Sequence, residues 1–162
     1  EHRARTVLGE LENLSKVDHP QRNFFGMMAY MCAGIRCENI STSHAALCIT
    51  SACSLIQKAI KVGEPISDFI SMYAILACIE MDRMIPGNSG HYLLGQLQQA
   101  YRDNPMLRLA SARSFLNRGL MRNAQKLVVE AGLETATAYS AAETIIQKII
   151  DLKKNKQYFF AQ

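Results

Sequence analysis

Helix start and stop signals recur along the whole sequence and constrain its fold more than any other feature. Asn104-Pro105 places a capping side chain before a proline in the first turn of a helix, and Gly63 follows an apolar stretch with helical spacing. No Asn-Gly or Asp-Gly hairpin dipeptide occurs, and no long apolar–polar alternation is present. The sequence therefore predicts an all-α fold. We expect about eight helices, over residues 2–16, 20–37, 41–61, 66–84, 91–102, 105–118, 120–131 and 135–155.

The links between these helices are mostly two to six residues long. Short links favour antiparallel neighbours, which gives either a helical bundle or a stack of helical hairpins. No linker divides the chain, and 162 residues fit one domain with a sizeable core. We therefore expect a single all-helical domain over residues 1–162.

The composition is that of a globular protein without a membrane span. Apolar residues make up 49% and charged residues 20% of the chain. The richest apolar stretch, residues 69–79, has about half of the roughly 18 to 20 residues that a span needs. We expect it to be a buried helix in a soluble domain. The last predicted helix has a core-facing stripe made of Ala138, Ala142, Ile145, Ile149 and Leu152.

The five cysteines lie within the predicted apolar helices. An odd number in such positions is typical of reduced core thiols, so we expect a reducing intracellular compartment. Cys32 and Cys37, and likewise Cys48 and Cys53, are five residues apart, which separates their side chains by about 140° around an ideal helix. Neither pair can point at one ion. We expect no bound metal and no cofactor.

Residues 105–138 carry a spacing pattern that is more specific than helicity alone. Small residues and one aromatic recur over two successive helices and their turn: Ala112, Phe115, Gly119, Ala124, Val128 and Ala131. Small side chains let two helices approach closely, while Phe115 fills the space between them. The pattern resembles a tetratricopeptide repeat, a helix–turn–helix unit of about 34 residues. The sequence departs from it at Arg108, Ser111 and Ala136, and an unrelated antiparallel helix pair is the alternative.

The resemblance implies that the first helix of the repeat contacts a partner protein. Five positions on that helix would face the partner: Met106, Leu109, Arg113, Leu116 and Asn117. The resemblance thus implies a protein-binding module, and it leaves the partner unspecified.

The chain begins at Glu1 without an initiator methionine, which indicates a fragment of a longer protein. Its length, its helix order and this start resemble the soluble part of the MIX family of mitochondrial proteins from trypanosomatid parasites. That resemblance implies an all-helical scaffold, tethered to the inner membrane through a segment upstream of Glu1. We therefore expect a mitochondrial scaffold or adaptor that binds other proteins.

The nucleophiles and histidines do not form a recognisable catalytic set. Cys37 and His44 flank one predicted loop, with Glu38 beside them. Nucleophilic catalysis needs such residues to converge, but composition alone often produces such a trio, and helix capping and packing explain it better. We expect a non-enzymatic protein with no catalytic residues. An enzyme of unknown chemistry that uses Cys37, His44 or His91 is an alternative.

The acidic residues and the glycine-rich loop carry no catalytic signature either. Glu80 and Asp82 lie two positions apart on a predicted helix and therefore face different directions. The loop at residues 86–90 is glycine-rich, but no Gly-Lys-Ser/Thr follows it. We expect this loop to be a flexible connector.

The formal charge of +4 is concentrated in the C-terminal half of the chain, where residues 102–162 carry 10 Lys/Arg and 5 Asp/Glu. A second hypothesis is therefore an RNA-binding helical-repeat module. Nucleic-acid binding usually adds stacking aromatics, and few lie near these charges, so the scaffold is the leading hypothesis. Three aromatics end the last helix, and they indicate packing or self-association: Tyr158, Phe159 and Phe160.

Overall fold

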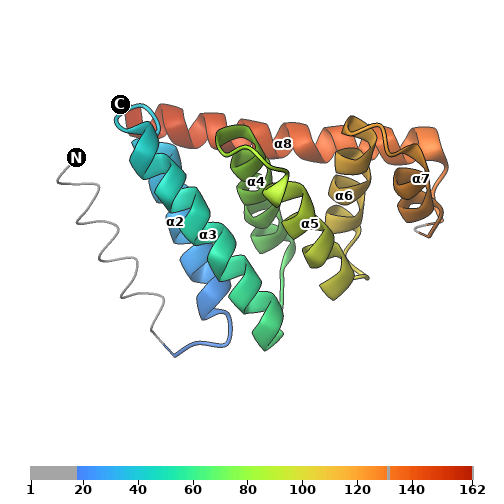
Figure 1. The fold of residues 1–162 in the computed structure, drawn as a ribbon, viewed down its shortest axis with the longest axis horizontal. Helices are drawn as coiled ribbons and strands as arrows, with labels where there is room; N and C mark the ends of the chain where they lie inside the picture. The colour runs from blue at the N-terminus through green and yellow to red at the C-terminus, as the bar shows by residue number, and fades with distance from the viewer. Residues whose placement is uncertain (1–17, 131, 162) are drawn as a thin grey trace.

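The computed structural model describes residues 18–130 and 132–161, and these form seven helices and no strand. The predicted all-α fold is confirmed over this range (Figure 1). The predicted helix at residues 2–16 and the side chains of the aromatic tail lie outside the described part. The helices are α2 (Arg22–Cys37), α3 (Thr42–Val62), α4 (Asp68–Met84), α5 (Ser89–Ala100), α6 (Pro105–Asn117), α7 (Met121–Glu130) and α8 (Thr135–Ala161).

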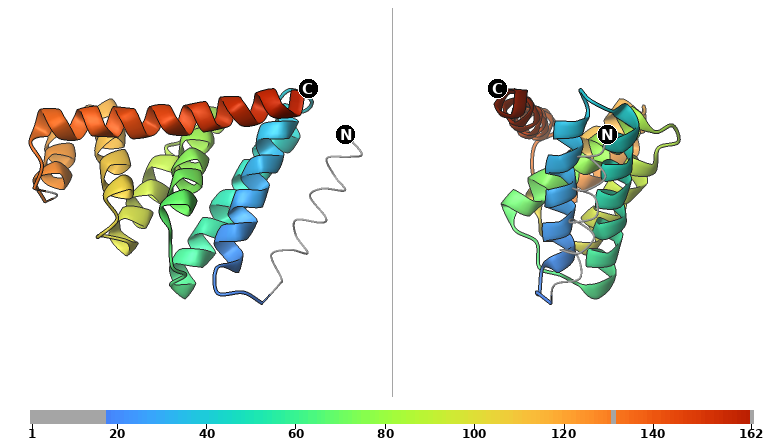
Figure 2. Two further views of the ribbon diagram at one scale, coloured as in Figure 1. Left: turned by 180° about the vertical axis from the view of Figure 1, so that it is seen from behind. Right: turned by 90° about the vertical axis from the view of Figure 1, so that its left-hand side faces the viewer.

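The first six of these helices form three hairpins that stand side by side in a row: α2/α3, α4/α5 and α6/α7 (Figure 1). Helices α2, α4 and α6 contact one another in turn. The long α8 runs along the row and contacts α2, α4, α6 and α7 (Figure 2). The arrangement is thus a stack of helical hairpins joined along one side by a single helix.

Several helix ends follow directly from local sequence. The Ser41 and Asn104 side chains accept hydrogen bonds from backbone amides in the first turns of α3 and α6, as N-caps do. Gly63 ends α3 in the left-handed conformation, with φ of 79°. The boundaries of α3 and α6 therefore fall within one residue of those that the sequence predicts.

The N-terminus of α2 is capped from a distance. Gln21, at the N-cap position, makes no side-chain capping bond. Instead, the carboxylate of Glu64, which lies after α3, accepts hydrogen bonds from the backbone amides of Asn23 and Phe24, at 3.1 Å each. Glu64 is only 3% exposed. A buried carboxylate at a helix N-terminus satisfies otherwise unpaired amides and interacts favourably with the helix dipole.

The structure corrects the end of the connector predicted at residues 86–90, because only residues 85–88 lie between α4 and α5. Helix α5 already begins at Ser89, and Gly90 is buried within its first turn. The Gly90 amide donates to Asp82 Oδ1 at 2.9 Å, and a Cβ at residue 90 would lie 1.9 Å from the carbonyl oxygen of Cys78. The close approach of α5 to α4 therefore requires a glycine at residue 90.

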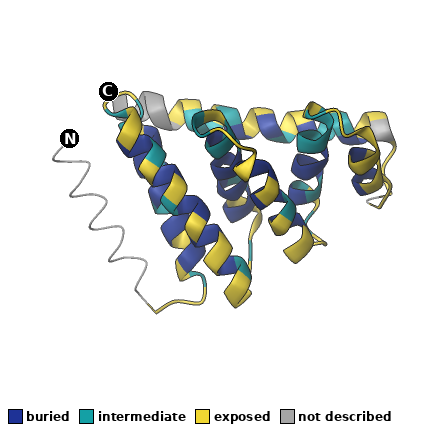
Figure 3. Cartoon of the chain, in the orientation of Figure 1, coloured by how far each residue is buried: buried dark blue, intermediate teal, exposed yellow. Residues whose placement is uncertain are grey.

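The core consists of a large cluster formed by α2–α6 and part of α8, and a smaller one where α6, α7 and α8 meet (Figure 3). The predicted stripe on α8 is confirmed in its main part, because Ala138, Ala142 and Ile149 are buried. Ile146 is buried beside them, while Ile145 and Leu152 are half-buried.

Helix α3 is the one helix in the described part that is long and apolar enough to cross a membrane by length and composition alone. One face of α3 belongs to the core, where Cys48, Ile49, Ala52, Ile56 and Ala59 are buried, while Leu47 and Val62 are exposed. A core helix meets the same criteria, so this property is explained by packing.

Ion pairs hold the C-terminal half of α8 against the row of hairpins. Lys153 of α8 lies 2.9 Å from Glu80 of α4 and 3.2 Å from Glu38 at the end of α2. Arg83 bonds to both carboxylates. Burial alone would raise the pKa of Glu38, but the hydrogen bond from Arg83 and the charge of Lys153 outweigh it, so the pKa is lowered.

Candidate functional site

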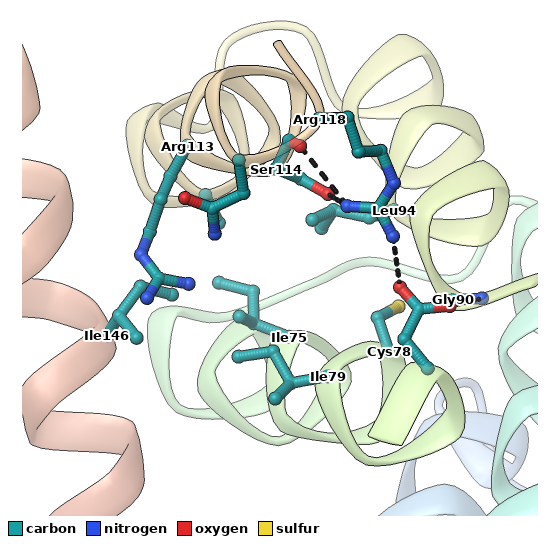
Figure 4. Close-up of a pocket in the computed structure, with 12 residues that line it drawn as sticks. Ile75, Cys78, Ile79, Gly90, Leu94, Arg113, Ser114, Arg118 and Ile146 are labelled. Atoms are coloured by element: carbon teal, nitrogen blue, oxygen red, sulfur yellow. Dashed lines mark hydrogen bonds and ion pairs between the residues drawn. The ribbon is translucent and has the colours of Figure 1, made fainter. Parts of the chain in front are cut away.

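A cavity of about 170 Å³ opens between α4, α5, α6 and α8 (Figure 4). One part of its wall is aliphatic and comes from all four helices: Ile75, Ile79, Leu94, Ala110 and Ile146. The other part is polar and comes mainly from the C-terminal half of α6: Asp82, Arg113, Ser114, Asn117 and Arg118. Concave sites with an apolar wall and a few convergent polar groups are where small ligands bind, so this cavity is the candidate site.

The polar wall is held in place by a hydrogen-bond network. The guanidinium of Arg118 donates to Asp82 at 2.8 Å and to the Ser114 hydroxyl at 2.9 Å (Figure 4). The Ser114 hydroxyl also lies 2.8 Å from Nδ1 of His91. Together with the bond from Gly90 to Asp82, this network joins α4, α5 and α6. The structure thus confirms that Glu80 and Asp82 face different directions, since Glu80 bonds to Arg83 and α8.

The charges around His91 favour its neutral form. Burial lowers the pKa of His91, and the positive charge of Arg118 lowers it further against the opposing effect of Asp82. The neutral imidazole donates from one ring nitrogen and accepts at the other, so the tautomer of His91 sets the direction of its hydrogen bond with the Ser114 hydroxyl, whose oxygen also accepts from Arg118. Among the described residues no carboxylate forms a hydrogen bond with His91 that would orient it as in a catalytic triad, and the imidazole ring packs edge-on against Phe115.

The cysteine and histidine candidates have separate partners. His44 lies 2.7 Å from the hydroxyl of Ser41 at the start of α3, whereas His91 bonds to α6. Cys37 interacts with Cys48. Burial raises the pKa of Cys48 to about 12, and the Cys37 thiol adds to that shift. In the part of the chain that the structure describes, no group of three His, Cys, Asp or Glu residues could hold a metal ion.

Two of the five α6 positions that the repeat resemblance assigns to a partner protein contact α8. Leu109 is 6% exposed and belongs to the small core cluster with Ala138 and Ala142 of α8. Arg113 Nε donates to Glu143 of α8 at 2.7 Å. The chain's own last helix therefore occupies much of this side of α6.

The other three predicted contact positions are spread over different surroundings. Met106 packs against the large core cluster, and Leu116 is half-buried. Asn117 is exposed and lines the cavity. Of the five positions, Arg113 and Asn117 are thus the two whose polar groups reach the candidate site.

Part of the excess positive charge is neutralised within the fold. Arg113, Arg118 and Lys153 each form an ion pair with a carboxylate. Arg122 and Lys126 of α7 are exposed, and no ion pair is seen for either among the described residues. The basic C-terminal half therefore presents fewer unpaired charges than its sequence suggests.

Helix α7 presents a second candidate surface at the end of the row. Met121 is 58% exposed and Val129 is 63% exposed, and exposed Leu120 and Leu133 flank the helix. Met121 and Val129 lie eight positions apart, which separates them by about 80° around an ideal helix and places them on the same broad side of α7. We call these four residues the α7 surface.

The fold and the site together define an all-α protein built from stacked helical hairpins with an inter-helical cavity. No protein-family model matches the sequence, and neither a curated protein nor a solved structure is significantly similar to the chain.

Proposed function

We propose that this protein is a non-enzymatic scaffold that binds another protein through the α7 surface. The observation that carries the proposal is the exposure of four large apolar side chains on and beside the short helix α7, at one end of the row of hairpins. Grouped exposed apolar residues mark sites of protein association, because their burial in a complex removes them from water.

The charges beside the α7 surface indicate the chemistry of the partner. Arg122 and Lys126 are exposed on α7 and lie next to Val129 around the helix. A partner segment that fits this surface is an amphipathic helix with an apolar stripe and acidic residues along one edge.

The resemblance to the MIX family supports a mitochondrial place for this scaffold, with attachment to the inner membrane through residues upstream of Glu1. That part of the proposal is tested by locating the full-length protein in cells and by extracting membranes with carbonate. A cytosolic full-length protein would contradict it.

The binding surface is tested with charge substitutions at matched exposed positions. Val129→Glu places a carboxylate on the α7 surface, whereas Val62→Glu places one on α3, where Val62 is 66% exposed. Both variants should fold, which circular dichroism and thermal melts check. Partners purified from native extract with the wild-type chain should be lost with Val129→Glu and kept with Val62→Glu. Equal partner profiles for the two variants would show that the α7 surface is not the binding site.

A further inference from the structure

The wall of the cavity between α4, α5, α6 and α8 has more hydrogen-bond donors than acceptors to pair with them. Arg113 uses its Nε for Glu143, and its two terminal nitrogens have no partner among the described residues. The side-chain amide of Asn117 likewise has no partner there. Nε of Arg118 is a buried nitrogen that lacks an acceptor. Buried polar groups are normally satisfied, and Nε of Arg118 is the exception here, whereas the donors of half-buried Arg113 and exposed Asn117 are open to an acceptor that enters the cavity.

We propose that this cavity binds a short-chain aliphatic carboxylate. A carboxylate supplies two acceptor oxygens in a plane, which matches the fork of an arginine guanidinium. The aliphatic part of the ligand packs against Ile75, Ile79 and Ile146, and its carboxylate faces Arg113. Figure 4 shows the end of the Arg113 side chain beside Ile146, above the aliphatic wall.

The volume sets the size of the ligand. A water molecule, which has one non-hydrogen atom, takes about 30 Å³ in the liquid. By this measure the cavity of about 170 Å³ accommodates about five or six non-hydrogen atoms. Butyrate and isobutyrate have six such atoms. Larger acids would extend through the open side of the cavity into solvent.

The acid in the wall does not oppose an anion. Both oxygens of Asp82 are engaged, one by the Gly90 amide and the other by Arg118. Glu143 is 64% exposed and accepts a hydrogen bond from Nε of Arg113, which leaves the two terminal nitrogens for a ligand. Each of these acids is matched by one arginine. The selectivity for an anion therefore comes from the directed N–H groups of Arg113 and Asn117.

The experiment is a titration of the ¹⁵N-labelled full chain with butyrate, followed by backbone amide shifts. Saturable shifts should appear at Ala110, Ser114 and Ile146, with a dissociation constant of about 1 mM, which is within the range that small ligands reach. Butylammonium has the same aliphatic chain with the opposite charge and should cause no saturable shift at these residues.

Three variants separate the site from general effects. Arg113→Met keeps the aliphatic stem but removes the donors and should weaken butyrate binding at least tenfold, because hydrogen bonds to charged groups are the strong ones. Ala110→Val fills part of the cavity and should also weaken binding. Arg122→Met removes one exposed positive charge from α7 and should leave binding unchanged.

Three results would overturn the proposal. One is the absence of saturable butyrate binding in the wild-type chain. Another is equal binding of butylammonium, which would indicate an unselective apolar contact. The third is an equal loss of affinity in Arg113→Met and Arg122→Met, which would indicate long-range charge attraction alone. Partner binding through the α7 surface is measured separately, so either proposal can fail without the other.

Discussion

Gly90→Ala is the substitution with the sharpest expected effect on stability. The added Cβ would lie 1.9 Å from the carbonyl oxygen of Cys78 and 2.9 Å from its carbonyl carbon. Both atoms belong to the backbone of α4, so they cannot rotate away as a side chain would. Overpacking costs about 1 to 3 kcal/mol, and alanine recovers about 1 kcal/mol of helix propensity. Because the obstacle is backbone, we expect the upper end of that cost and a net loss of about 2 kcal/mol.

Gly95→Ala is the matched control because it lies in the same helix. A Cβ at residue 95 meets nothing within 4 Å. We expect this variant to gain up to about 1 kcal/mol from helix propensity. In a chain of this size, 1 kcal/mol shifts the melting temperature by about 2 to 4 °C. Gly90→Ala should therefore melt about 4 to 8 °C lower, and Gly95→Ala slightly higher, in scans followed by circular dichroism. Similar shifts in the same direction would refute the close contact between α4 and α5.

Three further predictions test other parts of the fold. Glu64→Ala removes the cap of α2 and should lower the free energy of unfolding by about 2 to 3 kcal/mol in urea titrations; an unchanged midpoint would contradict that role. Burial raises the pKa of Cys48 and Cys53 to about 12 from 9.0. At pH 8 the fraction of thiolate at these two cysteines should therefore be about a thousandfold lower in the folded protein than in the unfolded chain. Iodoacetamide labelling of the folded and unfolded protein, measured by peptide mass spectrometry, checks this. Because the folded-state pKa of Glu38 is lowered, its contribution to stability is present above its ordinary value of 4.5 and is lost as the pH falls through the folded value. Lys153→Met should reduce that acid-side loss and lower stability by about 1 to 3 kcal/mol near pH 7; urea midpoints between about pH 3 and 7 that match the wild type would contradict it.

The helices could be predicted because their signals are local. Ser41 and Asn104 cap the helices that follow them, and Gly63 ends the helix before it. Each of these effects acts within about one turn of the chain, so a single sequence carries it. The same holds for the apolar stripe on α8, whose periodicity depends only on spacing.

The candidate site could not be predicted because its residues are distant in sequence. Asp82 and Arg118 are 36 positions apart, and Glu64 caps amides 40 and 41 positions before it. No local pattern signals such partners. Gly90 shows the same limit. Its sequence context is that of a flexible loop, and only the position of α4 reveals that the glycine serves packing.

The long α8 explains why the predicted partner positions and the observed surfaces differ. The repeat resemblance treats the first helix of each hairpin as an open face. In this fold that face of α6 is in contact with α8, which buries Leu109 and binds Arg113 through Glu143. The same helix contributes Ile146 to the cavity and thereby closes one side of it. Helix α8 thus covers much of this face of α6 and forms one wall of a small cavity there, which leaves the α7 surface as the exposed apolar part of that hairpin.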